Sequence, residues 1–315
     1  RQNGKITVNQ PFYSENINQL TAPNYDGFPL DLYLSPEPVL PVQFSRGCYY
    51  KDCAFCALTL DHQNFRQRDP GKTVDDLVWL KERYGAQSFF FTDECFALSP
   101  TKRLCQQMID RQVNVKWTCE LRFEKNLSRE LLTQMRDAGC LKIVFGLESF
   151  NQRVMDFMKK GIKQESVRRI VDDCVDLGIA VHCYVIVGFP TEKEEEALET
   201  MNFVVGNTKL HESYGFSCQP CLFDLEKEAP IMSDPGSYGI RRIMRPATED
   251  LSLGFFYEVQ EGMTPAQAEQ LYQQVYEKIS EVVCELPFNY SMADGLLYIA
   301  RAKSQALQVP QPTVS

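Results

Sequence analysis

The chain has 315 residues and 44% of them are hydrophobic, which is enough for one sizeable core and a smaller appended unit. Its formal net charge of −9 argues against a nucleic-acid partner, because binding to phosphates depends largely on Lys and Arg. The sequence shows neither a run of about eighteen apolar residues nor a signal-peptide pattern. We therefore expect a cytoplasmic protein without a membrane partner.

The chain contains twelve cysteines, but its length does not suit a disulfide scaffold, because such scaffolds occur in short secreted proteins. We expect most of the thiols to be reduced. Residue 1 is Arg rather than Met, which indicates a fragment or a processed chain.

Residues 1–38 are rich in Asn and Pro and lack sustained periodicity, which predicts an extended lead-in or linker. From Val39 to about residue 220, short apolar runs alternate with amphipathic stretches. The predicted strands cover residues 39–45, 88–92, 115–121, 142–148, 180–189 and 214–219. The predicted helices cover residues 74–85, 99–112, 128–139, a stretch that ends near residue 177, and residues 192–205.

Strands that alternate with helices predict an α/β unit over residues 39–220, with parallel strands joined by right-handed crossovers. The pattern alone does not separate a barrel from an open doubly wound sheet. In both folds the carboxyl ends of the strands carry the chemistry. Beyond residue 220 the alternation stops, and a long amphipathic helix is predicted over residues 264–286, so we expect residues 221–315 to form a mainly helical C-terminal cap.

The segment SRGCYYKDCAFC follows the first predicted strand and brings Cys48, Cys53 and Cys56 into one loop. Clustered thiolates suit an iron–sulfur cluster or zinc. Three thiols fill three corners of a four-iron cluster and leave one iron open to an outside ligand, which is a reactive arrangement. Structural zinc needs a fourth ligand, and the first Cys or His after Cys56 is His62. A third interpretation is that these cysteines only pack in the core.

This loop strongly resembles the cluster loop of radical S-adenosylmethionine (SAM) enzymes, and it is closest to members that carry an upstream cobalamin-binding domain. The usual loop has one residue fewer between the first two cysteines. The resemblance implies a partial (β/α)6 barrel of the radical SAM type, in which Cys48, Cys53 and Cys56 hold a [4Fe–4S] cluster. SAM would bind the open iron and be cleaved reductively to a 5′-deoxyadenosyl radical. Phe55 would lie near the adenine, although it could also simply pack within the loop.

Two further segments resemble the ends of the second and third strands of the family's barrel, and they follow the cysteine loop in the same order as in the family. In FFFTDECF, residues 89–96, the resemblance implies that Asp93 and Glu94 hold the methionine ammonium group of SAM. In CELRFEK, residues 119–125, it implies that Arg122 meets the methionine carboxylate, for which a guanidinium fork is well suited. Taken alone, acids at strand ends are often only solvated, and Arg122 could pair with a neighbouring Glu.

Two later segments complete this resemblance. In FGLES, residues 145–149, Glu148 or Ser149 would hydrogen-bond the ribose hydroxyls of SAM. In YVIVGFP, residues 184–190, the exposed backbone from Val185 to Gly188 would recognise the adenine. The alternative for Gly188 is an ordinary turn at the end of a strand.

Other cysteines leave several roles open. Cys95 follows the acidic pair and is a candidate hydrogen-atom donor to a substrate radical, although core packing is equally open to it. Cys218 and Cys221 form a CxxC motif that could bind zinc or a second cluster, act as a redox pair, or have no role. Because only Cys284 follows them, we expect no second cluster.

The resemblance implies hydrogen abstraction from a peptide or natural-product substrate, leading to methylation, epimerisation or rearrangement. A flavodoxin or ferredoxin would supply the electrons. Residues 28–48 resemble the linker that follows a cobalamin-binding domain, but the chain has no cobalamin motif of its own. Cobalamin is therefore expected only if such a domain lies upstream, and methylation is then the leading reaction. The alternatives are a non-catalytic iron–sulfur electron carrier and a zinc-stabilised binding module.

Overall fold

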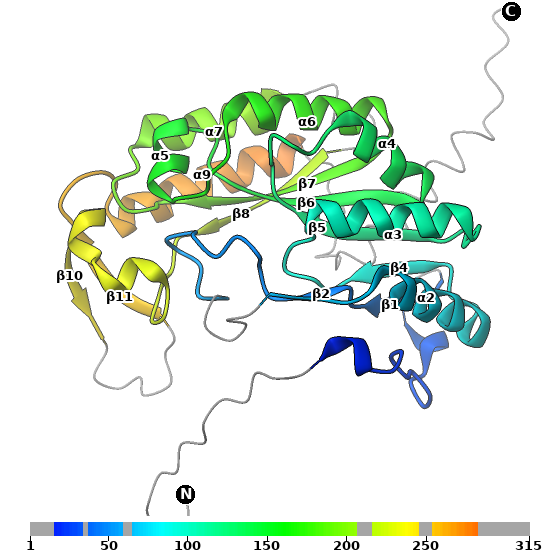
Figure 1. Cartoon of the computed structure of the whole chain (residues 1–315). Coiled ribbons are helices and arrows are strands. Elements are labelled where there is room, and N and C mark those ends of the chain that lie inside the picture. The colour runs from blue at the N-terminus through cyan, green and yellow to red at the C-terminus, as the bar shows by residue number, and fades with distance from the viewer. Residues whose placement is uncertain (1–15, 34–36, 59–64, 207–215, 246–253, 283–315) are drawn as a thin grey trace, which may run out of the picture.

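A computed structural model describes residues 16–33, 37–58, 65–206, 216–245 and 254–282 (Figure 1). Its centre is a parallel sheet of six strands, β1 (Val39–Val42), β4 (Ser88–Phe91), β5 (Lys116–Leu121), β6 (Cys140–Glu148), β7 (Ala180–Val187) and β8 (Phe216–Leu222). The strands lie side by side in chain order, and every neighbouring pair is parallel. The predicted sixth strand is confirmed and continues to Leu222, while residues 214–215 of the prediction lie outside the described residues.

The helices that connect these strands cover one face of the sheet (Figure 1). They are α2 (Pro70–Tyr84), α3 (Leu98–Asp110), α4 (Arg129–Asp137), α5 (Gln152–Phe157), α6 (Gln164–Asp176) and α7 (Glu194–Gly206). A doubly wound sheet has helices on both faces and a reversal in strand order. The straight strand order and the single helical layer therefore confirm the expected partial barrel.

The core lies between this helical layer and the sheet. Side chains alternate between the two faces of each strand, so Trp117 and Phe91 point toward the helices and are fully buried. Their rings meet edge to face, with centroids 5.6 Å apart. The opposite, concave face carries polar side chains such as Thr118 and Glu120, and the connecting helices do not cover it (Figure 1).

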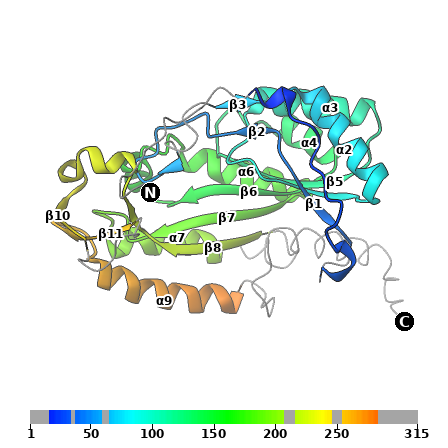
Figure 2. The same ribbon diagram turned by 90° about the horizontal axis from the view of Figure 1, so that it is seen from below.

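A small sheet follows the barrel, formed by β9 (Leu225–Glu226), β10 (Ile240–Met244) and β11 (Gly254–Val259). The prediction of a mainly helical cap did not contain this sheet, because its strands are short and the alternation of polar and apolar residues is weak. The long helix is confirmed as α9 (Pro265–Val282) and runs beside β8 (Figure 2). Residues 283–286 of the predicted helix lie outside the described residues.

The described part of the lead-in packs against the barrel. The Tyr25 amide donates to the Tyr84 hydroxyl at 2.9 Å, and Arg68 Nη2 donates to the Leu20 carbonyl at 3.0 Å. Residues 1–15 of the predicted lead-in lie outside the described residues, and the division at residues 38 and 220 stays a prediction. Among the described helices, none combines the length and the apolar character that a membrane span needs.

Gly139 ends helix α4 with a φ of 97°, and a Cβ atom at this position would lie 1.9 Å from the Val115 carbonyl oxygen. We predict that Gly139→Ala lowers the free energy of unfolding by about 3 kcal/mol, because backbone must move to relieve both strain and clash. Gly206→Ala is the control, since a Cβ there meets no atom within 4 Å. Urea denaturation should show a large loss for the first variant alone, and equal losses would contradict the argument.

Candidate functional site

The loop with the three predicted cluster ligands leaves the carboxyl end of β1 through β2 (Ser45–Arg46), which pairs with β3 (Arg66–Gln67). It crosses the concave side of the sheet (Figure 1). Within it, the Ala54 amide donates to the Met158 carbonyl at 2.9 Å, and the Ala54 carbonyl accepts from the Ile231 amide at 2.8 Å. The loop is therefore fastened both to the helix after β6 and to the C-terminal extension. Cys53 is buried, and Cys48 and Cys56 are half-buried.

The two acids after β4 hold the first part of this loop. Asp93 is buried and accepts hydrogen bonds from the Phe44 amide at 2.9 Å, the Ser45 hydroxyl at 2.6 Å and the Ser45 amide. Burial raises the pKa of Asp93 to about 7, although these hydrogen bonds oppose the shift. Glu94 accepts from the Gly47 amide at 3.0 Å. Both side chains thus contact the segment that directly precedes Cys48.

Cys95, the candidate hydrogen donor, is buried beside Cys48. A hydrogen bond between the two thiols lowers the pKa of Cys48 to about 5. For Cys56, burial is the largest cause, and it raises the pKa of that thiol to about 11. Cys95 therefore contacts a predicted cluster ligand.

Arg122 lies beneath the cysteine loop. Its Nη1 is 3.7 Å from Cys53 Sγ, its guanidinium carbon is 3.4 Å from the centre of the Tyr50 ring, and its Nη2 donates to the Lys160 carbonyl. Three soft thiolates suit an iron–sulfur cluster, and a buried cation in contact with one of them offsets their negative charge. Within the described ranges, no three Cys, His, Asp or Glu side chains converge on a point suited to a single metal ion. By their chemistry, three thiols in one loop with a buried cation beside Cys53 fit an iron–sulfur cluster.

Glu148 forms a buried ion pair with Lys160, with 2.9 Å between Oε1 and Nζ. Glu148 has a φ of 61° at an irregularity in the pairing of β6 with β7. Gly146 makes room for the pair, because a Cβ there would lie 2.7 Å from both charged atoms. Lys160 Nζ is also 5.6 Å from the centre of the Phe55 ring. Lys160 therefore lies between Phe55 and Glu148, and sequence reasoning missed this lysine.

The other residues expected to contact SAM divide between the two sides of the sheet. Ser149 Oγ lies 3.2 Å from the Thr200 hydroxyl of α7. Ser149 therefore faces the helical layer, whereas Glu148 faces Lys160. The Val185 side chain packs in the core, and its carbonyl accepts from Cys221 Sγ at 3.4 Å. The Gly188 amide donates to Glu192 Oε2 at 2.7 Å.

Two side chains of the concave face were not singled out from the sequence. Tyr184 on β7 donates a hydrogen bond to Glu120 on β5, with 3.4 Å between the oxygens. Burial raises the pKa of Glu120 to about 7, and the charges of Glu148 and Glu94 add to the shift. Both residues stand at alternate, polar positions of strands that the sequence predicted, so strand periodicity could have found them.

Cys218 and Cys221 lie on opposite faces of β8, since they are three positions apart in a strand. Cys218 pairs in register with Cys183 and packs against the helix-side core. Cys221 pairs with Ile186 on the concave side. Both thiols are free. This geometry does not bring the CxxC motif together as one metal site or redox pair.

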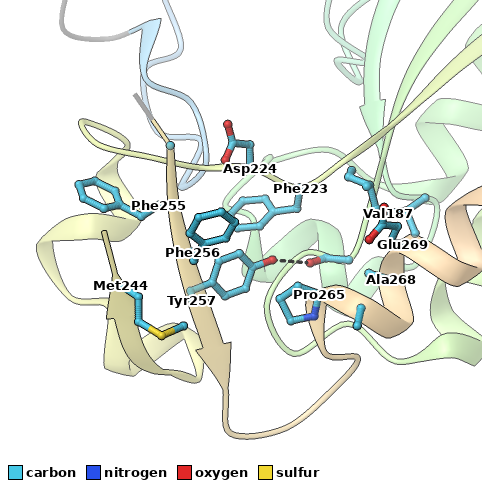
Figure 3. Close-up of a pocket in the computed structure, with 14 residues that line it drawn as sticks. Val187, Phe223, Asp224, Met244, Phe255, Phe256, Tyr257, Pro265, Ala268 and Glu269 are labelled. Carbon is cyan, nitrogen blue, oxygen red and sulfur yellow. Dashed lines mark hydrogen bonds between the residues drawn. The ribbon is translucent and has the colours of Figure 1, made fainter. Parts of the chain in front are cut away.

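A separate cavity of about 600 Å³ lies between α9, β11 and the ends of β7 and β8 (Figure 3). Its wall contains Phe223 and Tyr257, and the Tyr257 hydroxyl donates to the Gly188 carbonyl at 3.4 Å. No residue of the cysteine loop lines this cavity. It therefore adjoins the expected adenine end of the site without including the thiols.

Comparisons with known proteins give two curated relatives that match part of the chain. The chain is 27% identical over 208 residues to an uncharacterised methyltransferase of Pyrococcus horikoshii, a match that covers 64% of this chain and 45% of that protein. It is 31% identical over 160 residues to the anaerobic magnesium-protoporphyrin IX monomethyl ester cyclase of Rubrivivax gelatinosus, covering 50% of this chain and 29% of that protein. The chain thus spans less than half the length of these curated relatives.

Among solved structures, the fold resembles the radical SAM methyltransferase TsrM of Kitasatospora setae with cobalamin and a [4Fe–4S] cluster bound. That match has a TM-score of 0.56 and 14% identity, and it covers 86% of this chain and 61% of the other. The cobalamin-dependent SAM radical enzyme OxsB matches with a TM-score of 0.59 and 15% identity, covering 74% and 40%. These likenesses show the fold.

The family model of the radical SAM superfamily matches residues 42–204. This range begins in β1, contains the three cysteines and ends in α7, so it includes the whole described site apart from β8 and the C-terminal extension. The match confirms the resemblance, and with it an enzyme whose family uses a [4Fe–4S] cluster and SAM. The chain belongs to the radical SAM superfamily.

Proposed function

We propose that this chain is the radical-generating core of an enzyme that abstracts hydrogen from a peptide or natural product, and that methylation is its leading reaction. The observation that carries the proposal is that Arg122, just after the carboxyl end of β5, contacts Cys53 in the three-cysteine loop that follows β1. Methyltransferases among the relatives support the choice of methylation. Cobalamin would take part if a binding domain precedes this segment in the natural protein.

In this proposal, Cys48, Cys53 and Cys56 hold the cluster, and the chemistry that the bound cluster supplies is the one-electron reductive cleavage of SAM. Arg122 keeps a positive charge against Cys53 and is shielded from water by the Tyr50 ring. A low local dielectric strengthens that interaction. The residues thus stabilise the negative charge of the thiolates and position the loop.

The proposed contacts to SAM are those that the family resemblance implies. Glu94 and Arg122 would orient the methionine end, and Glu148 would bind the ribose beside the Phe55 ring. The backbone from Val185 to Gly188 would recognise the adenine. We propose that Asp93, Ser149 and Cys95 act by positioning, because their polar atoms already contact Ser45, Thr200 and Cys48, respectively.

The partners proposed for the enzyme are a small molecule or peptide as substrate and a flavodoxin or ferredoxin as reductant, without nucleic acid or membrane. A cytoplasmic location is supported by the free thiols of all eleven described cysteines, which suit a reducing compartment. The match to an enzyme family supports this function over the electron carrier and the zinc module.

Replacement of any one of Cys48, Cys53 or Cys56 by Ala should remove most of the bound iron and abolish the formation of 5′-deoxyadenosine from SAM and dithionite. The physical reason is that a cluster loses stability when one of its thiolate ligands is missing. The measurement is an iron count and product analysis after anaerobic purification. Cys105→Ala, in the helix-side core, is the control and should keep its iron. Full iron in all three loop variants would contradict the ligand assignment.

Lys160→Met should lower the free energy of unfolding by about 3 kcal/mol, because it leaves the Glu148 carboxylate buried without its cation. The double variant Glu148→Gln, Lys160→Met should recover most of this loss, since neither charge is then buried alone. Urea denaturation of the anaerobically purified proteins measures both values. A double variant as unstable as Lys160→Met would show that the lysine acts through packing rather than through its charge.

A further inference from the structure

The concave face of the sheet carries a pair of side chains that the expected SAM contacts do not use. Glu120 on β5 and Tyr184 on β7 meet across the intervening strand β6, with 3.4 Å between their oxygens. In the sheet register, Tyr184 lies beside Gly146 of β6 and Glu120 lies beside Val144. Because Gly146 has no side chain, the phenol can extend over β6 and reach the carboxylate.

Unlike Glu148, whose partner is a charged lysine, Glu120 accepts its hydrogen bond from a neutral phenol. Glu148 is paired with the ammonium group of Lys160, and Glu94 accepts from the Gly47 amide. In the part of the chain that the structure describes, Glu120 forms no salt bridge, and its hydrogen-bond donor is the neutral phenol of Tyr184. Burial is the largest cause that raises its pKa to about 7; the hydrogen bond from Tyr184 opposes this shift, the charges of Glu148 and Glu94 add to it, and Lys160 opposes it least. Among the described residues, the carboxylate therefore has no cation in direct contact with it.

An unpartnered hydroxyl and a buried ammonium group on the same face give an independent indication of a ligand. Thr118, two residues before Glu120, is fully buried, and its hydroxyl has no hydrogen-bond partner. In register beside it lies Lys142, which is 7% exposed and has its pKa lowered to about 8 by burial. His182 on β7 is partnered, since its Nδ1 lies 2.8 Å from the Ser217 hydroxyl. Burial and Lys142 lower its pKa to about 3, so this imidazole is neutral. Buried polar groups are usually satisfied, so this row suits a polar molecule that enters the barrel.

We propose that Glu120 and Tyr184 form the substrate-recognition site of the barrel, in which Glu120 binds a protonated amine of the substrate and Tyr184 holds the carboxylate in place. Thr118 and Lys142 face the electron-rich end of the same molecule. The substrate class is therefore an amine that also carries hydrogen-bond acceptors. This inference rests on the proposed function, because it takes the concave face as the place where the substrate meets SAM.

The test uses two probes of similar size and opposite charge, 2-phenylethylamine and 3-phenylpropionate. Saturation-transfer NMR of the holoenzyme with SAM measures their affinities. At pH 8 the amine should bind the wild type, and Glu120→Gln should weaken it about tenfold through loss of one charge-assisted hydrogen bond. Tyr184→Phe, which keeps the carboxylate, should weaken it less, and Glu130→Gln on the exposed face of α4 should have no effect. Wild-type affinity should fall from pH 8 to pH 6, because Glu120 becomes protonated.

Equal amine affinity in the wild type and Glu120→Gln would overturn the proposal, as would stronger binding of 3-phenylpropionate than of the amine. SAM affinity, measured by equilibrium dialysis, supplies a second readout. A tenfold loss of SAM affinity in Glu120→Gln would assign this carboxylate to SAM instead and would also overturn the proposal. Loss of the proposed radical function itself is distinguishable, because it appears in the iron count and in 5′-deoxyadenosine formation rather than in amine binding.

Discussion

The attachment of the cysteine loop to the neighbouring strand is the constraint on which the site depends. Asp93 receives hydrogen bonds from Phe44 and Ser45, and Glu94 receives one from Gly47, so the end of β4 fixes the backbone just before Cys48. Farther along, Ala54 is bonded to Met158 and Ile231. A loop tied at both ends loses little conformational entropy when it binds a cofactor, since most of that entropy is already lost on folding.

The charges around the cysteine loop form a second constraint on the site. Three thiolates close together repel one another, and burial makes that repulsion stronger. Arg122 and Lys160 place two cations near Cys53, while Glu148 and Glu124 balance those cations in turn. The site is thus a network of alternating charges, in which removal of one partner leaves another buried without compensation.

The sequence allowed the elements to be predicted well, because strand and helix periodicities are local properties. The predicted ranges 74–85 and 128–139 end at Gly85 and Gly139, and in the structure both glycines adopt positive φ just beyond α2 and α4. The small C-terminal sheet escaped prediction because its strands are short and their alternation of polar and apolar residues is weak. Lys160 escaped for a related reason: its ion pair with Glu148 depends on a tertiary contact, and in the sequence it is one lysine in a polar stretch.

The pleat of the strands explains which predicted neighbours come together. Glu148 and Ser149 are adjacent in sequence, and only one of them could face the concave side in a regular strand. The irregularity after Gly146 and the positive φ of Glu148 direct this carboxylate toward Lys160, and Ser149 then meets Thr200 of α7. The same rule puts Glu120 and Tyr184 on the concave side. A backbone irregularity therefore turns Glu148 toward Lys160, while regular alternation supplies the other polar side chains of the concave face.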